Sequence, residues 1–400
     1  MEKQNNITPK KELYDRILKF QSLMQENRLN GSLVCQNVDL FYFTGTIQRS
    51  FLYIPVIGEP LFMVKKSFTR ARQESNLKYI EQIHSSKDIP RLLKEYGFFE
   101  HKIVGLEFDV LPTSYFLEFK KFFPDVSFQD VSLLIKKVRM IKSDFEIKNI
   151  KESIKIIEKV LDYARNHIRE GMTELELDGI LGALARKEGH QGRVRIRGWN
   201  QEMFYTAVLC GGTAGVPSYM ESPIGGPGTT PAIAQGASKN KIKKNEPIFI
   251  DFGVGINGYI GDMTRTYTIG RLPDKLYKSY SVLKEIESKV IEKASPGTPC
   301  SALYNEAEKI AEKRGFDRFF MGCGEGKVFF IAHGIGLEID ELPVISRNYH
   351  STLKEGMVFA LEPKFIFPGL GAIGFENDFL ITKDGPERLS RIDNEIIHID

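Results

Sequence analysis

The chain has 400 residues, a formal net charge of +3, 42% hydrophobic residues and 27% charged residues, which is typical of a globular protein with room for two domains. The balanced charge gives no reason to expect binding to nucleic acid or to an anionic membrane. The four cysteines lack C-x-x-C spacing, and we find neither an apolar leader nor a run of about 18 apolar residues. Together these features predict a cytoplasmic protein with reduced thiols and no membrane span.

Helical and strand patterns alternate over roughly the first 135 residues. Apolar positions recur at helical spacing in 11–28 and 114–123. The expected strands are 31–36, 40–45, 51–58, 61–66 and 101–110. This alternation predicts an α/β domain.

A second domain is expected to begin near residue 138, which gives domains 1–137 and 138–400. Ser143 and Glu146 have the spacing of a capping box at the start of a helix. Helices are expected over 144–169, 174–188 and 275–314, with pairs of strands between them. The C-terminal domain is therefore predicted to be α+β.

The segment 197–236 is rich in Gly, Pro, Ser and Thr, and a loop of this length is usually functional or disordered. Just before it, Arg193, Arg195 and Arg197 are expected on one face of a strand. They could bind a substrate carboxylate, although a solvated face or a dimer contact is the commoner explanation. The basic run 239–246 is expected to be an exposed turn.

Two aspartates interrupt an otherwise apolar pair of strands on either side of Asn257-Gly258. Asn-Gly strongly favours a two-residue hairpin turn, because both residues tolerate positive φ. In that register Asp251 faces Thr264, and Asp262 is its diagonal neighbour on the same face. Two carboxylates so close in an apolar setting require either a proton or a cation between them.

A second pair of acids, Glu362 and Glu376, interrupts two apolar runs near the C-terminus. An odd-length loop centred on Gly369 places them opposite each other, whereas a two-residue loop would put them on opposite faces. His333 lies between the two acid pairs in the chain, at the end of an expected strand and before a Gly-rich turn. A histidine in this position is usually structural, but here it accompanies four acids.

These five residues together suggest a metal centre. Four carboxylates carry about four negative charges, which two divalent cations would neutralise. Oxygen ligands with one imidazole suit Mn, Fe, Co or Zn better than a soft metal. Two such ions bridging a water are a common means of making a nucleophile near neutral pH.

The order of these motifs ("IDFG", "GDMTRT", "HGIGLE", "EP" and "FEND") resembles that of the pita-bread metallohydrolases, which include Xaa-Pro aminopeptidases, prolidase, methionine aminopeptidase and creatinase. Residues 11–130, including "DLFYFTG", resemble the creatinase-type N-terminal domain. The resemblance implies a creatinase-type α/β N-terminal domain and an α+β pita-bread catalytic domain. It also implies a homodimer, as is common among these relatives.

The same resemblance implies a role for each acid. Asp262 and Glu376 would bridge two metal ions, Asp251 would chelate one of them, and His333 and Glu362 would bind the other. Glu362 would also be the general base that accepts a proton from the bridging water.

Two positions depart from the peptidase pattern. Peptidases of this family usually carry a Pro-His step before the first aspartate, where this chain has Ala234-Gln235. They also carry His-Glu-x-Pro after the His-Gly motif, where this chain has Asp340-Glu341-Leu342-Pro343. Asp340 could carry a proton if its pKa is raised, but a hydrogen-bonded structural role is an equal alternative.

Three functions follow from these observations. The first is a metal-dependent peptidase that cleaves Xaa-Pro bonds. The second is a creatinase-like hydrolase or lyase acting on a small carboxylated amine, with Trp199, Asn200 and Gln201 building a small polar pocket and an arginine holding the carboxylate. The candidate substrate-binding residues are Trp199, Arg197 and Gln235. The third is a binding protein without activity, against which the complete ligand set argues.

Overall fold

The computed structural model describes residues 7–98 and 100–399, which form two compact units. Unit 1 comprises Met1–Arg139 and Arg197–Asn200, and unit 2 comprises Met140–Ile196 and Gln201–Asp400. Part of the sequence on which the leader prediction rests, residues 1–6, lies outside the described residues. Within the described ranges, no helix is both long enough and apolar enough to cross a membrane.

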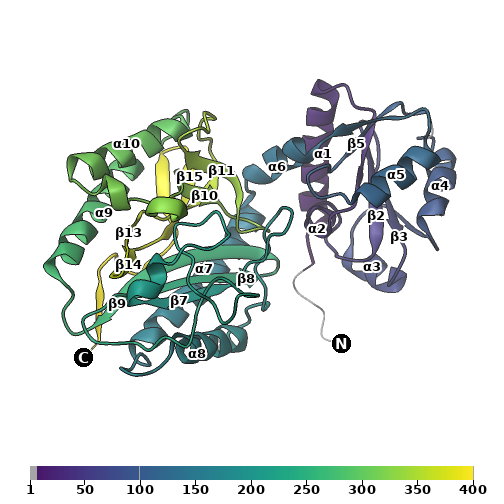
Figure 1. Cartoon of the computed structure of the whole chain (residues 1–400). Helices are drawn as coiled ribbons and strands as arrows, with labels where there is room; N and C mark the ends of the chain where they lie inside the picture. Colours follow the sequence, from purple (N-terminus) through teal and green to yellow (C-terminus); the bar gives the residue numbers. More distant parts are fainter. Residues whose placement is uncertain (1–6, 99, 400) are drawn as a thin grey trace. The chain divides into compact units, whose positions relative to one another are not determined.

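Unit 1 is built on a six-stranded mixed sheet in the order β4-β3-β2-β1-β5-β6 (purple to blue in Figure 1). Its elements are α1 (Lys10–Glu26), β1 (Gly31–Val34), α2 (Asn37–Thr44), β2 (Ser50–Pro55), β3 (Leu61–Val64), α3 (Phe68–Glu74), β4 (Tyr79–Gln82), α4 (Ile89–Glu95), β5 (Ile103–Leu106), α5 (Thr113–Phe122), β6 (Ser127–Asp130) and α6 (Ser132–Met140). The predicted alternation of helices and strands is confirmed.

One predicted strand of unit 1 is wrong. Residues 40–44 belong to α2, which begins where the Gln36 side chain accepts hydrogen bonds from the backbone N–H groups of Val38 and Asp39. The helix ends at Gly45, whose φ of 79° lies in the left-handed region that favours glycine at a helix end. These two end signals outweigh the β-propensity of the aromatic residues between them.

Unit 2 contains five-, four- and two-stranded sheets in the orders β11-β10-β12-β15-β16, β17-β9-β8-β7 and β13-β14. Its helices are α7 (Asp144–Arg165), α8 (Glu174–Lys187), α9 (Asp274–Lys293) and α10 (Cys300–Lys313). Its strands are β7 (Thr206–Cys210), β8 (Ile248–Ile256), β9 (Tyr259–Ile269), β10 (Phe330–Gly334), β11 (Glu341–Ser346), β12 (Val358–Leu361), β13 (Lys364–Phe367), β14 (Gly371–Gly374), β15 (Asn377–Thr382), β16 (Gly385–Arg388) and β17 (Ile397–Ile399). The predicted α+β architecture and the Ser143 capping box of α7 are confirmed.

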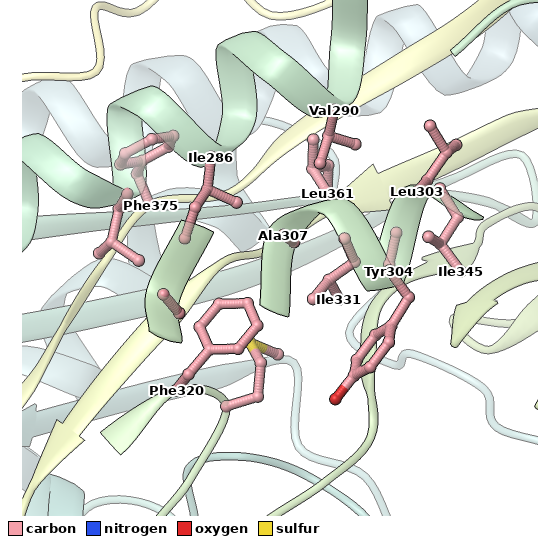
Figure 2. Close-up of a cluster of buried hydrophobic side chains, with 14 of the residues drawn as sticks. Ile286, Val290, Leu303, Tyr304, Ala307, Phe320, Ile331, Ile345, Leu361 and Phe375 are labelled. Carbon is pink, nitrogen blue, oxygen red and sulfur yellow. The ribbon is translucent and has the colours of Figure 1, made fainter. Parts of the chain in front are cut away.

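The sheets of unit 2 lie between two pairs of helices, α7 with α8 and α9 with α10 (Figure 1). The apolar faces of α9 and α10 pack against the five-stranded sheet, and Figure 2 shows Ile286, Leu303, Ile331 and Leu361 within this core. Burying such aliphatic side chains stabilises the fold by roughly 1.5–3 kcal/mol each.

The predicted strand between residues 193 and 197 is not formed. The backbone there is irregular, and the carbonyl of Arg195 accepts a hydrogen bond from the N–H of Ile339. The predicted long loop 197–236 is interrupted by β7, which pairs with β8 along its whole length. Residues 206–210 are therefore part of the four-stranded sheet, and the rest of the segment has an irregular backbone apart from a short 3-10 turn at Gly211–Gly215.

Candidate metal centre

The β8–β9 hairpin holds the first pair of acids in the predicted register. Asp251 pairs with Thr264 and Gly253 pairs with Asp262, which makes the two aspartates diagonal neighbours. The Asp251 side chain is 23% exposed, whereas that of Asp262 is buried. Oδ1 of Asp262 has no hydrogen-bond partner within the described part of the chain. A buried carboxylate oxygen without a donor is a ligand atom available to a cation.

The second pair of acids lies at the interruption of one long hairpin. Leu361 pairs with Asn377 before the interruption, and Lys364 pairs with Gly374 after it. Both pairings keep the register centred on Gly369, so Glu362 and Glu376 stand opposite each other as predicted. Leu361 and Phe375 belong to the core beneath α9 and α10. Since side chains alternate along a strand, the two glutamates point to the opposite face.

His333 on β10 brings the two pairs of acids together. Its Nε2 atom lies 3.5 Å from Oε1 of Glu362, 3.7 Å from Oε1 of Glu376 and 3.9 Å from Oδ2 of Asp262. One ligand atom each from Asp262, His333 and Glu376 lie within 4.8 Å of one another. These spacings suit donors that converge on one cation.

Glu376 is held in place by β9. The Thr264 hydroxyl donates to Oε2 of Glu376 (2.6 Å), and the backbone N–H of Glu376 donates to the Thr264 carbonyl (3.1 Å). The buried guanidinium of Arg265 donates to the Glu376 carbonyl (2.8 Å) and to Oδ1 of Asn377 (2.8 Å). Asp378 accepts the N–H of Asp262 (3.0 Å). Hydrogen bonds of this kind fix the orientation of metal ligands.

Because several carboxyl groups are buried close together, the pKa values of the cluster acids are shifted in different directions. Burial, partly opposed by Lys364, raises the pKa of Asp251 to about 7. Burial and the charges of Glu376 and Asp251 raise the pKa of Asp262 well above its usual range. Burial also acts against ionisation of Glu376, but Lys364 and His333 hold its pKa at about 2. Without a bound cation, some of these carboxyl groups therefore hold a proton while Glu376 is ionised, as expected where a metal would replace the protons.

Lys364 is the residue of this site that the sequence analysis missed. Its side chain is 1% exposed, and its ammonium donates to Glu362 and lies 3.5 Å from Oε2 of Glu376 and 3.7 Å from Oδ2 of Asp251. The signal was present in "EPKFIF", where a lysine interrupts an apolar strand two residues after Glu362 and thus on the same face. The charge count that predicted two cations did not include it.

The acids open into a cavity of about 270 Å³ within unit 2. The segment after residue 200 provides much of its apolar wall, including Met203, Phe204 and Tyr205. Phe330, Ile339 and other apolar side chains complete this wall. A mainly apolar cavity with a few convergent polar groups is typical of a small-molecule or peptide site.

The remaining predicted site residues differ in position. Asp340 and Gln235 both line the cavity, and the Gln235 amide donates to the Glu202 carbonyl (2.8 Å). Arg197 and Trp199 belong to unit 1. The Arg197 guanidinium donates to Asp39 (2.6 Å) and to both carboxylate oxygens of Asp109 (2.7 and 2.9 Å). Trp199 is 85% exposed.

Comparison with known proteins covers both units. The family model described as metallopeptidase family M24 matches residues 148–383, and the creatinase/prolidase N-terminal domain model matches residues 16–141. The chain is 27% identical over 385 residues to the Xaa-Pro dipeptidase of Pyrococcus horikoshii, covering 96% of this chain and 99% of that protein.

Solved structures agree with this match. The crystal structure of the prolidase from Pyrococcus horikoshii OT3 has a TM-score of 0.81 at 26% identity, covering 96% of this chain and all (100%) of that one. The X-Pro aminopeptidase from Thermotoga maritima has a TM-score of 0.78 at 26% identity, covering 96% and 99%. The predicted creatinase-type N-terminal domain and pita-bread catalytic domain are thereby confirmed, and the chain belongs to metallopeptidase family M24.

Proposed function

We propose that the protein is a metal-dependent peptidase that cleaves Xaa-Pro bonds. The observation that carries this proposal is the convergence of Asp262, His333 and Glu376 on one point at the base of an apolar cavity. Similarity over nearly the whole chain to the Xaa-Pro dipeptidase of Pyrococcus horikoshii supports the choice of bond. A divalent ion bound at this point would polarise the scissile carbonyl and lower the pKa of a water.

The chain's own residues would divide the remaining work. Asp262, His333 and Glu376 would hold the ion, and Glu362 and Asp251 complete the predicted ligand set. The resemblance makes Glu362 the candidate general base; its Oε1 faces His333, and its Oε2 accepts a hydrogen bond from Lys364. Asp340 on the cavity wall is the candidate for carrying a proton to the leaving amine.

The apolar wall of the cavity is consistent with a prolyl ring in the substrate. Proline offers no backbone N–H, so a site that receives it needs apolar contact rather than a hydrogen-bond acceptor at that atom. Tyr205, Ile339 and Phe330 supply such surface. Gln235 lines the same cavity and remains a candidate for contact with the substrate.

Finer features of the proposal rest on the donor chemistry and on the resemblance. Carboxylates with one imidazole favour Mn, Co, Fe or Zn. The resemblance predicts two ions and a homodimer, while the scattered free cysteines favour the cytoplasm. Lys364 competes for the same carboxylates as a second ion would.

The proposal is tested by hydrolysis of Xaa-Pro dipeptides and Xaa-Pro-Xaa peptides with Mn²⁺- or Co²⁺-loaded protein, with metal content measured on the same sample. We expect turnover of both peptide classes and little turnover of matched Xaa-Ala peptides. Asp262→Ala and Glu376→Ala are expected to lose both the metal and the activity.

Two outcomes would contradict the proposal. If metal-loaded protein cleaves none of these peptides, a creatinase-like reaction on a small carboxylated amine becomes the better explanation. If Asp262→Ala and Glu376→Ala retain full metal content, the ligand assignment is wrong.

A further inference from the structure

Lys364 provides a positive charge within the cluster of acids itself. Its ammonium contacts Glu362, Glu376 and Asp251, three of the four carboxylates that the resemblance assigns to two metal ions. The side chain is 1% exposed, so these contacts are shielded from water and from salt. A buried ammonium and a divalent ion cannot occupy the same place against Asp251.

The carboxylate oxygens divide between the lysine and the histidine. Glu362 directs Oε2 to Lys364 and Oε1 to His333, and Glu376 does the same. Asp251 lies on the lysine side, where its Oδ2 is 3.7 Å from Nζ. Asp262 lies on the histidine side, where its Oδ2 is 3.9 Å from Nε2. The site therefore has two halves, and one of them already contains a cation.

The histidine half has the dimensions of a single ion site. Donors bound at about 2.0–2.2 Å to one tetrahedral ion lie roughly 3.3–3.6 Å apart. Nε2 of His333 lies 3.5, 3.7 and 3.9 Å from the facing oxygens of Glu362, Glu376 and Asp262. Small inward movements of these side chains would complete four ligands around one ion.

The lysine half is built to hold its side chain. Lys364 pairs with Gly374 across β13–β14, and a Cβ on Gly374 would lie 2.7 Å from Cγ of Lys364. The Lys364 carbonyl accepts the N–H of Met321 (2.9 Å), and Nζ lies 5.7 Å from the centre of the Phe249 ring. The missing side chain at Gly374 leaves the space that the lysine stem fills.

We propose that Lys364 takes the place of one of the two cations, so that the centre holds a single divalent ion on Asp262, His333, Glu376 and Glu362. One divalent ion and one ammonium supply three positive charges to the four carboxylates, whereas a second ion would make them five. Asp251 then serves as the partner of Lys364 rather than as a metal ligand. This inference rests on the proposed metal centre.

The first test counts metal ions in the unmodified protein. The full chain is stripped with a chelator, saturated with Mn²⁺ or Co²⁺, freed of excess metal, and examined by elemental analysis and native mass spectrometry. We expect one ion per chain. Two ions per chain would overturn this inference and leave the proposed peptidase intact, whereas no bound ion would contradict the metal centre on which both rest.

Variants test the role of the lysine itself. Lys364→Met keeps the length of the side chain but removes its charge, and it is expected to bind a second ion. Lys142→Met is the matched control, since Lys142 is also a buried lysine but pairs with Glu341 (3.0 Å), outside the cluster. The control is expected to keep one ion. A Lys364→Met protein that still binds only one ion would show that the lysine does not exclude the second.

A pair of aspartate variants gives an answer even if Lys364→Met fails to fold. Asp262→Asn is expected to weaken binding of the ion by roughly 100-fold or more, while Asp251→Asn should change its Kd by less than about threefold. Isothermal titration with Mn²⁺ measures both. Equal losses in the two variants would assign Asp251 to the metal and overturn the inference.

Discussion

At the scale of single residues, two neighbouring acids in the loop after His333 have different surroundings. Glu341 is buried, accepts the N–H groups of Leu337 (2.9 Å) and Glu338 (3.1 Å), and pairs with Lys142. Asp340 is exposed and lines the cavity. The first acid fixes the loop, and the second is free to face a substrate. Of these two acids, Asp340 is the one that stands where the family pattern has a histidine.

We therefore predict that Asp340→Asn lowers kcat by about tenfold or more without loss of metal or of thermal stability. The reason is that the amide keeps the shape of the side chain but cannot accept and release a proton. Steady-state kinetics, metal content and melting temperature on one preparation measure the three effects. Glu341→Gln is the structural control and is expected to lower the melting temperature, because it leaves Lys142 without a charged partner. An unchanged kcat in Asp340→Asn would return that residue to a structural role.

At the scale of elements, β9 both supplies a candidate ligand and positions another. Asp262 is on this strand, and two residues later Thr264 donates its hydroxyl to Glu376. Thr266, two residues further, donates its hydroxyl to the Gly374 carbonyl (2.7 Å) and accepts the Gly374 N–H (3.1 Å), so its hydroxyl bonds to the backbone of β14. The strand β9 thus has one threonine hydroxyl bonded to a candidate metal ligand and a second threonine hydroxyl bonded only to backbone.

Thr264→Val is predicted to weaken metal binding by about 10- to 100-fold, because Glu376 loses the hydrogen bond that orients its carboxylate. Its stability should fall by roughly 1–3 kcal/mol, as for other buried hydrogen bonds. Thr266→Val should lose similar stability but keep the metal affinity of the unmodified protein. Metal titration and denaturant unfolding of both variants separate the two effects. Equal metal affinities in the two variants would contradict a positioning role for Thr264.

The same elements show how far the sequence reaches. Asn257-Gly258 and the loop around Gly369 predicted both hairpin registers, because turn chemistry and the period of two specify them locally. The helix at 37–44 was misread as a strand, because its end signals, Gln36 and Gly45, lie outside the aromatic run. Lys364 was missed for a different reason. Its contact with Glu362 follows from their spacing of two residues, but its contact with Asp251 depends on the meeting of β13 and β8, which no local pattern specifies.

At the scale of the whole molecule, the cluster of acids couples metal binding, pH and stability. The pKa of Asp251 is about 7 in the folded metal-free protein against an ordinary value of 3.8. Between these pH values the folded state binds more protons at this group than the unfolded state. Its contribution to the free energy of unfolding therefore falls as pH rises through this window.

We predict that metal-free protein loses stability relative to Asp251→Asn as pH rises from 5 to 7, by at most about 1.4 kcal/mol per pH unit, the slope for one proton. The comparison with Asp251→Asn is needed because burial lowers the pKa of His190 to about 4, which gives a slope of opposite sign in both proteins. Urea unfolding with a chelator present measures the difference. Parallel pH profiles for the two proteins would contradict the raised pKa.

The charge of the cavity predicts which peptides the protein prefers. Its charged lining residues, among those the structure describes, are His333 and the acids Glu221, Asp251, Asp262, Asp340, Glu362 and Glu376, without a lysine or arginine. The proposed ion and Lys364 would neutralise most of the charge of the four cluster acids, which leaves Glu221 and Asp340. These two acids would repel a free carboxylate next to the prolyl residue and attract a free amino group. Electrostatic complementarity thus favours a substrate with a free amino end and no nearby carboxylate.

We predict that Xaa-Pro amides and Xaa-Pro-Xaa peptides are cleaved with kcat/KM about tenfold above that of the matching Xaa-Pro dipeptides. N-acetylation of the substrate is expected to lower kcat/KM by a similar factor. Each effect corresponds to roughly 1.4 kcal/mol of transition-state stabilisation. The comparison uses one metal-loaded preparation at low and high salt, because an electrostatic preference of exposed groups weakens as salt is added. Glu221→Gln is expected to reduce the penalty of N-acetylation while leaving the metal content unchanged, since Glu221 lines the cavity but is not one of the predicted ligands. Faster cleavage of the free dipeptides would mean that a cation outside these lining residues receives the substrate carboxylate, and the preference would then be set by that group rather than by the acidic wall.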